Sequence, residues 1–98
     1  MLNPTPRERM VDRQGRPYFL WDCDMTLAEF RRRLEVGDDA EQAYLIGKLM
    51  RQAKPDDVFL FARVEVIRRR WPEIERYLGN TREFWHWLLA SRERQGRA

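Results

Sequence analysis

The longest regular pattern of apolar residues in the chain lies between Asp38 and Ala53. Apolar positions recur there three, four and seven residues apart, which is the spacing of one helix face. They are Ala43, Ile46, Gly47, Met50 and Ala53, and Tyr44, Leu45 and Leu49 widen the stripe. Asp38 and Glu41 have the spacing of a capping box, and Pro55 predicts the end of the helix. The pattern therefore predicts a helix that is buried on more than one face.

Gly47 lies inside this predicted helix, where glycine costs about 1 kcal/mol relative to alanine. We therefore expect another backbone to approach Gly47 closely, in a packing contact.

Shorter patterns on both sides predict further helices. Thr26 and Glu29 form a second capping box, before a helix that ends near Gly37. A new helix is expected at Asp56, directly after Pro55.

The stretch from Val58 to Ile67 is open to two interpretations. Its β-branched and aromatic residues are typical of a strand. However, Leu60, Val64 and Ile67 keep the spacing of a helix face. We favour a helix with a break near Ala62.

Two helices are predicted after this stretch. Pro72 suits the first turn of a short helix that ends at Gly79. Asn80 and Glu83 predict the start of a last helix that is apolar nearly all round. That last helix should be buried or should contact a partner.

The predicted fold class is all-α, a compact bundle of about five short helices with an extended N-terminal segment. Residues 1–16 have no apolar period and are expected to form a mobile or loosely docked tail. Residues 17–91 form a single helical domain, in which Pro17 to Trp21 is expected to pack as an extended segment. Residues 92–98 are predicted to form a basic C-terminal tail.

The composition fits one folded domain. The chain has 98 residues, of which 43% are hydrophobic, and it contains four tryptophans. Cys23 is the single cysteine, so no internal disulfide can form. No apolar run approaches the roughly 20 residues that span a bilayer, and the N-terminus has no signal-peptide core. These features predict a cytoplasmic protein without a membrane segment.

The formal net charge is +3, and the excess is C-terminal. Residues 50–98 hold eleven basic and seven acidic side chains. The basic clusters are Arg68, Arg69 and Arg70, and Arg92, Arg94 and Arg97. Such clusters can contact phosphates or an acidic partner, although a solvated helix face is the commoner explanation.

The segment from Asp22 to Thr26 resembles the first motif of haloacid-dehalogenase-type phosphatases, D-x-D-x-T. Lys54 and the pair Asp56 and Asp57 loosely match further residues of that family. Its chemistry requires a parallel sheet, for which this chain has too few strand-like segments. We therefore interpret Asp22 and Asp24 as turn and helix-entry residues.

Two other reactive side chains lack the neighbours that catalysis needs. His86 is the single histidine and has no second ligand at metal-binding spacing. Cys23 has no predicted base, and a lone cysteine usually packs as a small apolar residue. The sequence predicts no catalytic residue, no metal and no cofactor.

The leading functional prediction is a non-enzymatic module that binds another protein. Tryptophan beside arginine is typical of interface anchors. The predicted partner-binding residues are Arg68, Arg69, Trp71, Trp85 and Trp87. The alternatives are a small nucleic-acid-binding regulator that uses the arginine clusters, and a self-associating structural protein.

Three segments carry a family resemblance: Pro17 to Asp22, Ala43 to Phe59, and the pair Trp71 and Pro72. Over residues 17–89 the chain resembles small bacterial proteins that are often encoded beside AbiEii-type nucleotidyltransferase toxins. The resemblance implies a helical accessory protein, in the role of an antitoxin or another partner of such a toxin. It implies no catalytic residue.

Overall fold

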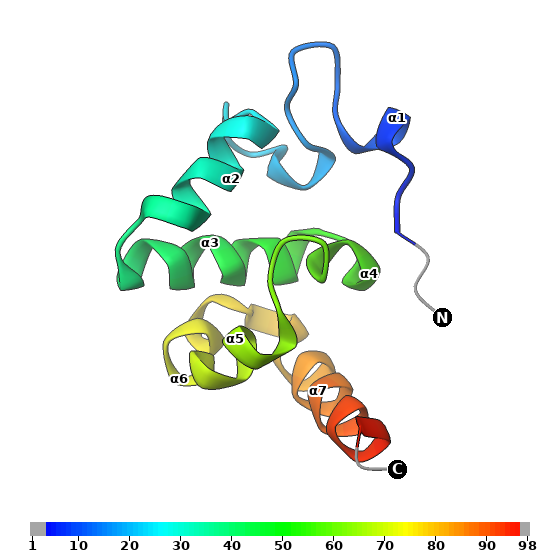
Figure 1. Cartoon of the computed structure of the whole chain (residues 1–98), viewed down its shortest axis with the longest axis vertical. Coiled ribbons are helices and arrows are strands. Elements are labelled where there is room, and N and C mark those ends of the chain that lie inside the picture. The colour runs from blue at the N-terminus through cyan, green and yellow to red at the C-terminus, as the bar shows by residue number, and fades with distance from the viewer. Residues whose placement is uncertain (1–3, 97–98) are drawn as a thin grey trace.

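A computed structural model describes the backbone of residues 4–96 and the side chains of residues 4–91 (Figure 1). The prediction of an all-α fold is confirmed, because residues 4–96 contain helices and no strand. The α-helices are α1 (Arg7–Met10), α2 (Leu27–Val36), α3 (Asp39–Gln52), α4 (Pro55–Val58), α5 (Val64–Arg69), α6 (Trp71–Ile74) and α7 (Arg82–Gly96). The 3₁₀ helices are η1 (Tyr18–Leu20), η2 (Glu75–Tyr77) and η3 (Gly79–Thr81). The helices are thus more numerous than predicted, and most are shorter.

Helix α3 lies at the centre of the fold. In Figure 1 it separates α2 and the N-terminal segment from α5, α6 and α7, and it contacts elements on both sides. The carboxylate of Asp38 accepts a hydrogen bond from the main-chain N–H of Glu41, with 2.8 Å between the two atoms. Residues 45–50 are all buried. The predicted cap at Asp38 and most of the apolar stripe are therefore confirmed, whereas Tyr44 is 44% exposed and does not belong to the buried face.

Gly47 marks the closest packing against α3. A Cβ atom added there would lie 2.6 Å from the Cβ atom of Tyr77. Only a residue without a side chain fits at this distance, so η2 can lie directly against α3. The predicted packing contact is confirmed, but the group nearest to Gly47 is the side chain of Tyr77 and not the expected backbone.

The stretch from Val58 to Ile67 divides into two short helices. Helix α4 ends at Val58, residues 59–63 form a turn, and α5 begins at Val64. The break predicted near Ala62 is confirmed. Val58 and Ala62 are buried, so the apolar residues at both ends of the turn belong to the core.

The N-terminal segment is part of the fold over residues 4–16, so the prediction of a loosely docked tail is wrong for these residues. Met10 is buried, and the N–H of Leu27 donates to the carbonyl of Gly15 over 2.8 Å. The next residues, Tyr18 to Leu20, form the 3₁₀ helix η1 and not the predicted extended segment. This turn directs Phe19 and Leu20 into the core together, which an extended chain would place on opposite sides.

Helix α7 differs from its prediction at both ends. Asn80 lies within η3 and not at a helix cap, and the hydroxyl of Thr81 donates to the carbonyl of Leu78 over 2.6 Å. At the other end the backbone of α7 continues to Gly96, which is within the predicted basic tail at residues 92–98. The side chains of Arg92 and Arg94, and all of Arg97, lie outside the described part of the chain. No helix in residues 4–96 is both long enough and apolar enough to cross a membrane.

Candidate protein-binding groove

The five predicted partner-binding residues do not form one surface. Trp85 is 1% exposed and lies in the core, so its prediction as a surface anchor is wrong. Trp87 is 59% exposed and lies beside Phe84, with 6.2 Å between the ring centroids. The two tryptophans are only two positions apart and therefore lie on different faces of α7.

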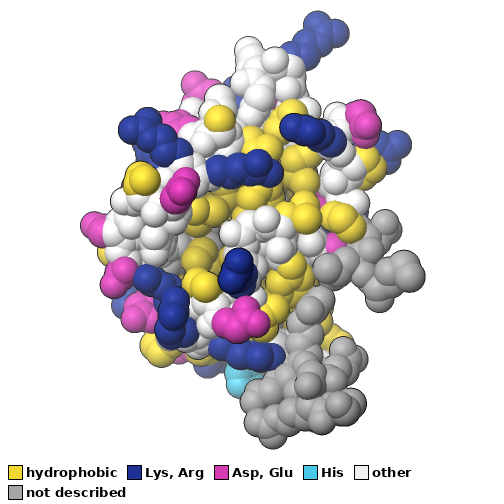
Figure 2. All heavy atoms as spheres, viewed as in Figure 1, with side chains coloured by type: hydrophobic (Ala, Val, Ile, Leu, Met, Phe, Trp, Pro, Cys, Tyr) yellow, Lys and Arg dark blue, Asp and Glu magenta, His cyan; other side chains and the backbone are white. Residues whose placement is uncertain are grey.

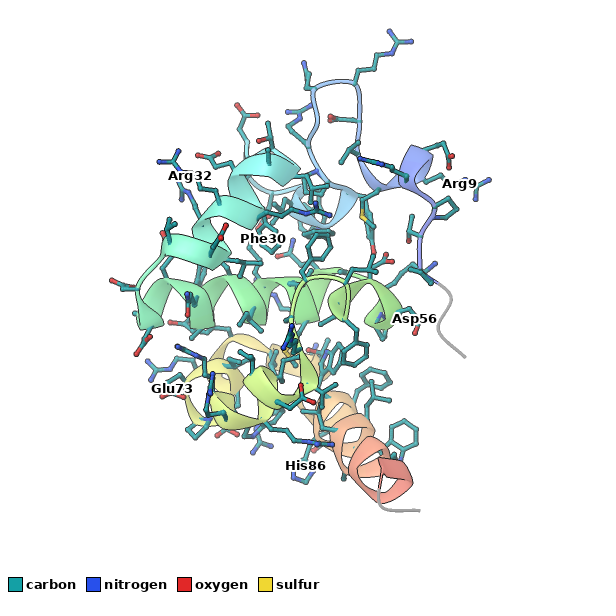
Figure 3. All side chains as sticks on the ribbon, in the orientation of Figure 1. Arg9, Phe30, Arg32, Asp56, Glu73 and His86 are labelled. Carbon is teal, nitrogen blue, oxygen red and sulfur yellow. The ribbon has the colours of Figure 1, made fainter. Side chains whose placement is uncertain are left out.

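Arg68 and Trp71 lie together in a small hollow of about 260 Å³. Its other lining residues are His86, Leu89 and Ala90. Arg68 Nη2 donates to the carbonyl of Leu89 over 2.7 Å, which fixes the guanidinium against α7. His86 lies at the outer edge of the molecule on α7 (Figure 3). Within the described residues this hollow stands apart, because it shares no lining residue with the hollows described below.

Arg69 belongs to a different surface. It lines a hollow of about 310 Å³ together with Arg70 and Val66, on the side of α5 that faces α2 and α3. Arg70 forms an ion pair with Asp39 over 2.9 Å. Successive residues of a helix point in different directions, so the run from Arg68 to Arg70 is divided between two faces.

The residues that resemble the phosphatase motif do not converge. Asp22 forms an ion pair with the buried ammonium group of Lys48 over 2.6 Å. The hydrogen bond from Lys48 lowers the pKa of Asp22. Asp24 is instead an exposed residue that pairs with Arg16 over 3.3 Å. Within residues 4–91, no group of three His, Cys, Asp or Glu side chains could hold a metal ion.

Asp57 anchors the N-terminal segment and is fully buried. It accepts hydrogen bonds from the Thr5 N–H over 2.7 Å and from the Thr5 hydroxyl over 2.5 Å. The Tyr18 hydroxyl donates to Asp57 over 2.5 Å and accepts from the Lys54 N–H over 2.8 Å. Burial opposes the charge on Asp57, but the hydrogen bonds from Thr5 and Tyr18 hold its pKa below the ordinary value. This carboxylate therefore ties residues 4–18 to α4.

The largest hollow of the molecule lies between this anchored segment, α2 and the turn after α4. Its volume is about 830 Å³, and Met10, Val11, Leu27 and Phe61 are among its lining residues. A second hollow of about 290 Å³ shares Arg31, Leu60 and Phe61 with it. The hollow beside Arg69 shares Leu34 and Phe61 with the second. The three hollows therefore adjoin one another through shared lining residues, and we name the three together the central groove.

Phe61 lines all three hollows and therefore lies at the middle of the central groove. Its ring packs edge-on against the buried rings of Phe19 and Phe30, with centroid distances of 5.6 and 5.7 Å. Figure 3 shows Phe30 on the side of α2 that faces α3. The floor of the groove is therefore supported by the aromatic core. Leu60, next to Phe61, is 51% exposed.

Arginine side chains border this apolar floor. They are Arg7, Arg31, Arg63, Arg69 and Arg70, and Glu35 is the one acidic side chain among the described lining residues. The guanidinium of Arg31 lies over the ring of Phe61, 5.3 Å from its centroid. Figure 2 shows hydrophobic side chains gathered in the middle of this face, with Lys and Arg side chains around and across them.

The sequence prediction reached the central groove only through Arg69. The other predicted partner-binding residues, which are Arg68, Trp71, Trp85 and Trp87, do not line it. A usable signal was present in the apolar run from Val58 to Phe61, because four successive apolar residues cannot all be buried in a tight turn.

No protein-family model, curated protein or solved structure matches this chain. The resemblance to proteins encoded beside AbiEii-type toxins remains a prediction from the sequence.

Proposed function

We propose that the protein is a non-enzymatic, cytoplasmic protein–protein interaction module that binds a segment of its partner in the central groove. The observation that carries this proposal is that three adjoining hollows meet at Phe61, with Leu60 half exposed beside it. An apolar centre with arginine and aromatic residues and a charged rim is the usual composition of a protein interface.

The shape of the groove supports a macromolecular partner over a small molecule. A site for a small molecule is usually one concave pocket that surrounds its ligand. The central groove instead consists of three adjoining hollows, from Val11 at one end to Arg70 at the other. The sequence resemblance suggests a nucleotidyltransferase-type toxin as the partner.

A nucleic-acid-binding regulator is the less supported alternative. Its predicted contacts were the clustered arginines. However, Arg68 donates a hydrogen bond to the Leu89 carbonyl, and Arg70 forms an ion pair with Asp39. Single-stranded nucleic acid binds to basic channels with several stacking rings, whereas Phe61 is the one aromatic ring among the described lining residues. If phosphates were bound, the affinity would fall steeply with added salt.

Site-specific crosslinking tests the proposal. The tagged full-length chain is expressed in its host with a photo-crosslinking amino acid at position 60 or at position 87. Leu60 and Trp87 have similar exposures, 51% and 59%, but only Leu60 lines the groove. We expect a stoichiometric protein partner that crosslinks from position 60 and not from position 87.

Two outcomes would contradict the proposal. A partner that crosslinks only from position 87 would move the interface to the exposed face of α7, near the original prediction. Recovery of no stoichiometric protein at either position, under conditions where the tagged chain is folded, would refute a protein-binding function.

A further inference from the structure

The charge around the central groove specifies the chemistry of its occupant, provided that the proposed protein-binding function holds. The five arginines and one glutamate among the lining residues give a local net charge of +4. The whole chain has a formal net charge of only +3. Asp39 pairs with Arg70, and the other four arginines still outnumber the single glutamate of the lining.

Most of these arginines are available to a partner. Within residues 4–91, Arg7, Arg31, Arg63 and Arg69 form no ion pair, whereas Arg70 is paired with Asp39. They come from both ends of the groove, because Arg7 and Arg31 line the hollow beside the N-terminal segment and Arg63 and Arg69 line the hollow beside α5. Carboxylates are the side chains that a row of guanidinium groups pairs with best.

We infer that the central groove binds an acidic amphipathic helix of the partner protein. Its apolar stripe would pack on Leu34, Leu60 and Phe61, and its acidic residues would face the arginines at the two ends of the groove. A helix is the fitting conformation because residues 4–96 contain no strand whose edge could pair with an extended peptide. Apolar residues at i, i+3, i+4 and i+7 form the matching stripe.

Charge also distinguishes this occupant from a second copy of the chain. A symmetric dimer places the same patch of both copies face to face. At the central groove that arrangement would bring Arg31 and Arg69 of one copy close to the arginines of the other. Like charges that face each other in an interface weaken association. The carboxylates of an acidic segment would instead form favourable ion pairs with these arginines.

The test uses three synthetic peptides of about 15 residues, long enough for roughly four helical turns. All three carry leucines at i, i+3, i+4 and i+7. Their remaining positions are mostly glutamate in the first peptide, glutamine in the second and lysine in the third. Binding to the full-length protein is measured by fluorescence anisotropy at low and at moderate salt. We expect the glutamate peptide to bind about tenfold more tightly than the glutamine peptide, with salt reducing this difference, and the lysine peptide to bind most weakly.

Arginine variants test whether the preference for the glutamate peptide comes from the groove. Replacing Arg31 or Arg69 by glutamine should weaken binding of the glutamate peptide by about threefold each, a typical effect for an exposed charge pair. Arg32→Gln is the matched control, since Arg32 is also on α2 but points away from the groove (Figure 3). It removes the same charge and should leave the affinity within about twofold.

Equal binding of the glutamate and glutamine peptides would overturn the inference while leaving the proposed function intact. Equal losses of affinity in Arg31→Gln and Arg32→Gln would overturn it as well. The affinity would then depend on the net charge of the protein and not on the position of the arginine. Failure of all three peptides to bind would refute a helix in the groove. Displacement of the bound glutamate peptide by a single-stranded oligonucleotide at similar concentrations would assign the arginines to phosphate instead. The crosslinking from position 60 decides the proposed function separately.

Discussion

The indole Nε1–H of Trp85 donates a hydrogen bond to the main-chain carbonyl of Met50, with 2.8 Å between nitrogen and oxygen. Trp85 is thereby fixed to the last turn of α3, and its ring also packs against Phe59 with 6.0 Å between the centroids. One side chain of α7 thus holds the last helix, the central helix and the turn after α4 together.

Replacing Trp85 by phenylalanine should therefore lower the free energy of unfolding by about 2–3 kcal/mol. The variant loses buried volume and leaves the Met50 carbonyl without its donor. Urea denaturation measures the change. Trp87→Phe is the matched control and should change stability by less than about 0.5 kcal/mol, because Trp87 is exposed. Equal losses in both variants would show that Trp87 is also buried in solution.

Asp57→Ala should lower the free energy of unfolding by about 2 kcal/mol at neutral pH, because Thr5 and Tyr18 lose their charged acceptor. The exposed Asp24→Ala is the control and should have little effect. Trypsin should also cleave the variant faster at Arg7 and Arg9, since the N-terminal segment is released. Unchanged stability and unchanged cleavage would contradict the anchoring role of Asp57.

The contribution of Asp57 should depend on pH with a defined sign. Its pKa in the folded protein is lower than the ordinary value of 3.8. The stability that Asp57 contributes is therefore complete well above pH 3.8 and is lost as the pH falls through the lowered pKa. The difference in unfolding free energy between the wild type and Asp57→Ala should stay constant near neutrality and shrink in acid. A difference that grew in acid would contradict this assignment.

Tyr18 should titrate at unusually high pH. Burial of its hydroxyl, together with the hydrogen bond to Asp57, raises the pKa of Tyr18 to about 12 from an ordinary value of 10.0. Its contribution to stability is present below pH 10 and is lost as the pH rises through about 12. Tyrosinate absorbance, compared between the wild type and Tyr18→Phe, measures this pKa. In Asp57→Asn the pKa of Tyr18 should be lower than in the wild type. An unchanged pKa would show that Asp57 does not contribute to the raised pKa of Tyr18.

Gly47→Ala should destabilise the protein by about 1–3 kcal/mol, although alanine is the better helix former by about 1 kcal/mol. The added methyl group would lie 2.6 Å from Tyr77 Cβ, so η2 or α3 would have to move. Thermal unfolding compares the two proteins. A higher melting temperature for Gly47→Ala would show that Tyr77 shifts at little cost.

Regular helices could be predicted well from this sequence because their signals are local. The helix caps at Asp38 and Thr26 each depend on a residue three positions further along the chain. The packing contact at Gly47 depends on one face of a single helix. The anchoring of the N-terminal segment could not be predicted in this way. It depends on a carboxylate 52 residues away from Thr5, and nothing near Thr5 indicates that partner.

The candidate site was harder to predict for two physical reasons. On a helix that is apolar nearly all round, the pattern cannot show which of Trp85 and Trp87 is buried. In the turn at residues 59–63, neither the helix period nor the strand period applies, so the pattern could not show that Leu60 is exposed while Ala62 is buried.

The central groove is assembled from parts far apart in the sequence: the N-terminal segment, α2, the turn after α4 and α5. It exists only when all of these parts are folded together. A partner that binds there therefore favours the complete native state over every partly folded one, and adds about 2.7 kcal/mol to the unfolding free energy at one hundred times its dissociation constant. The lifetime of this chain in a protease-containing cell would consequently rise and fall with the supply of its partner.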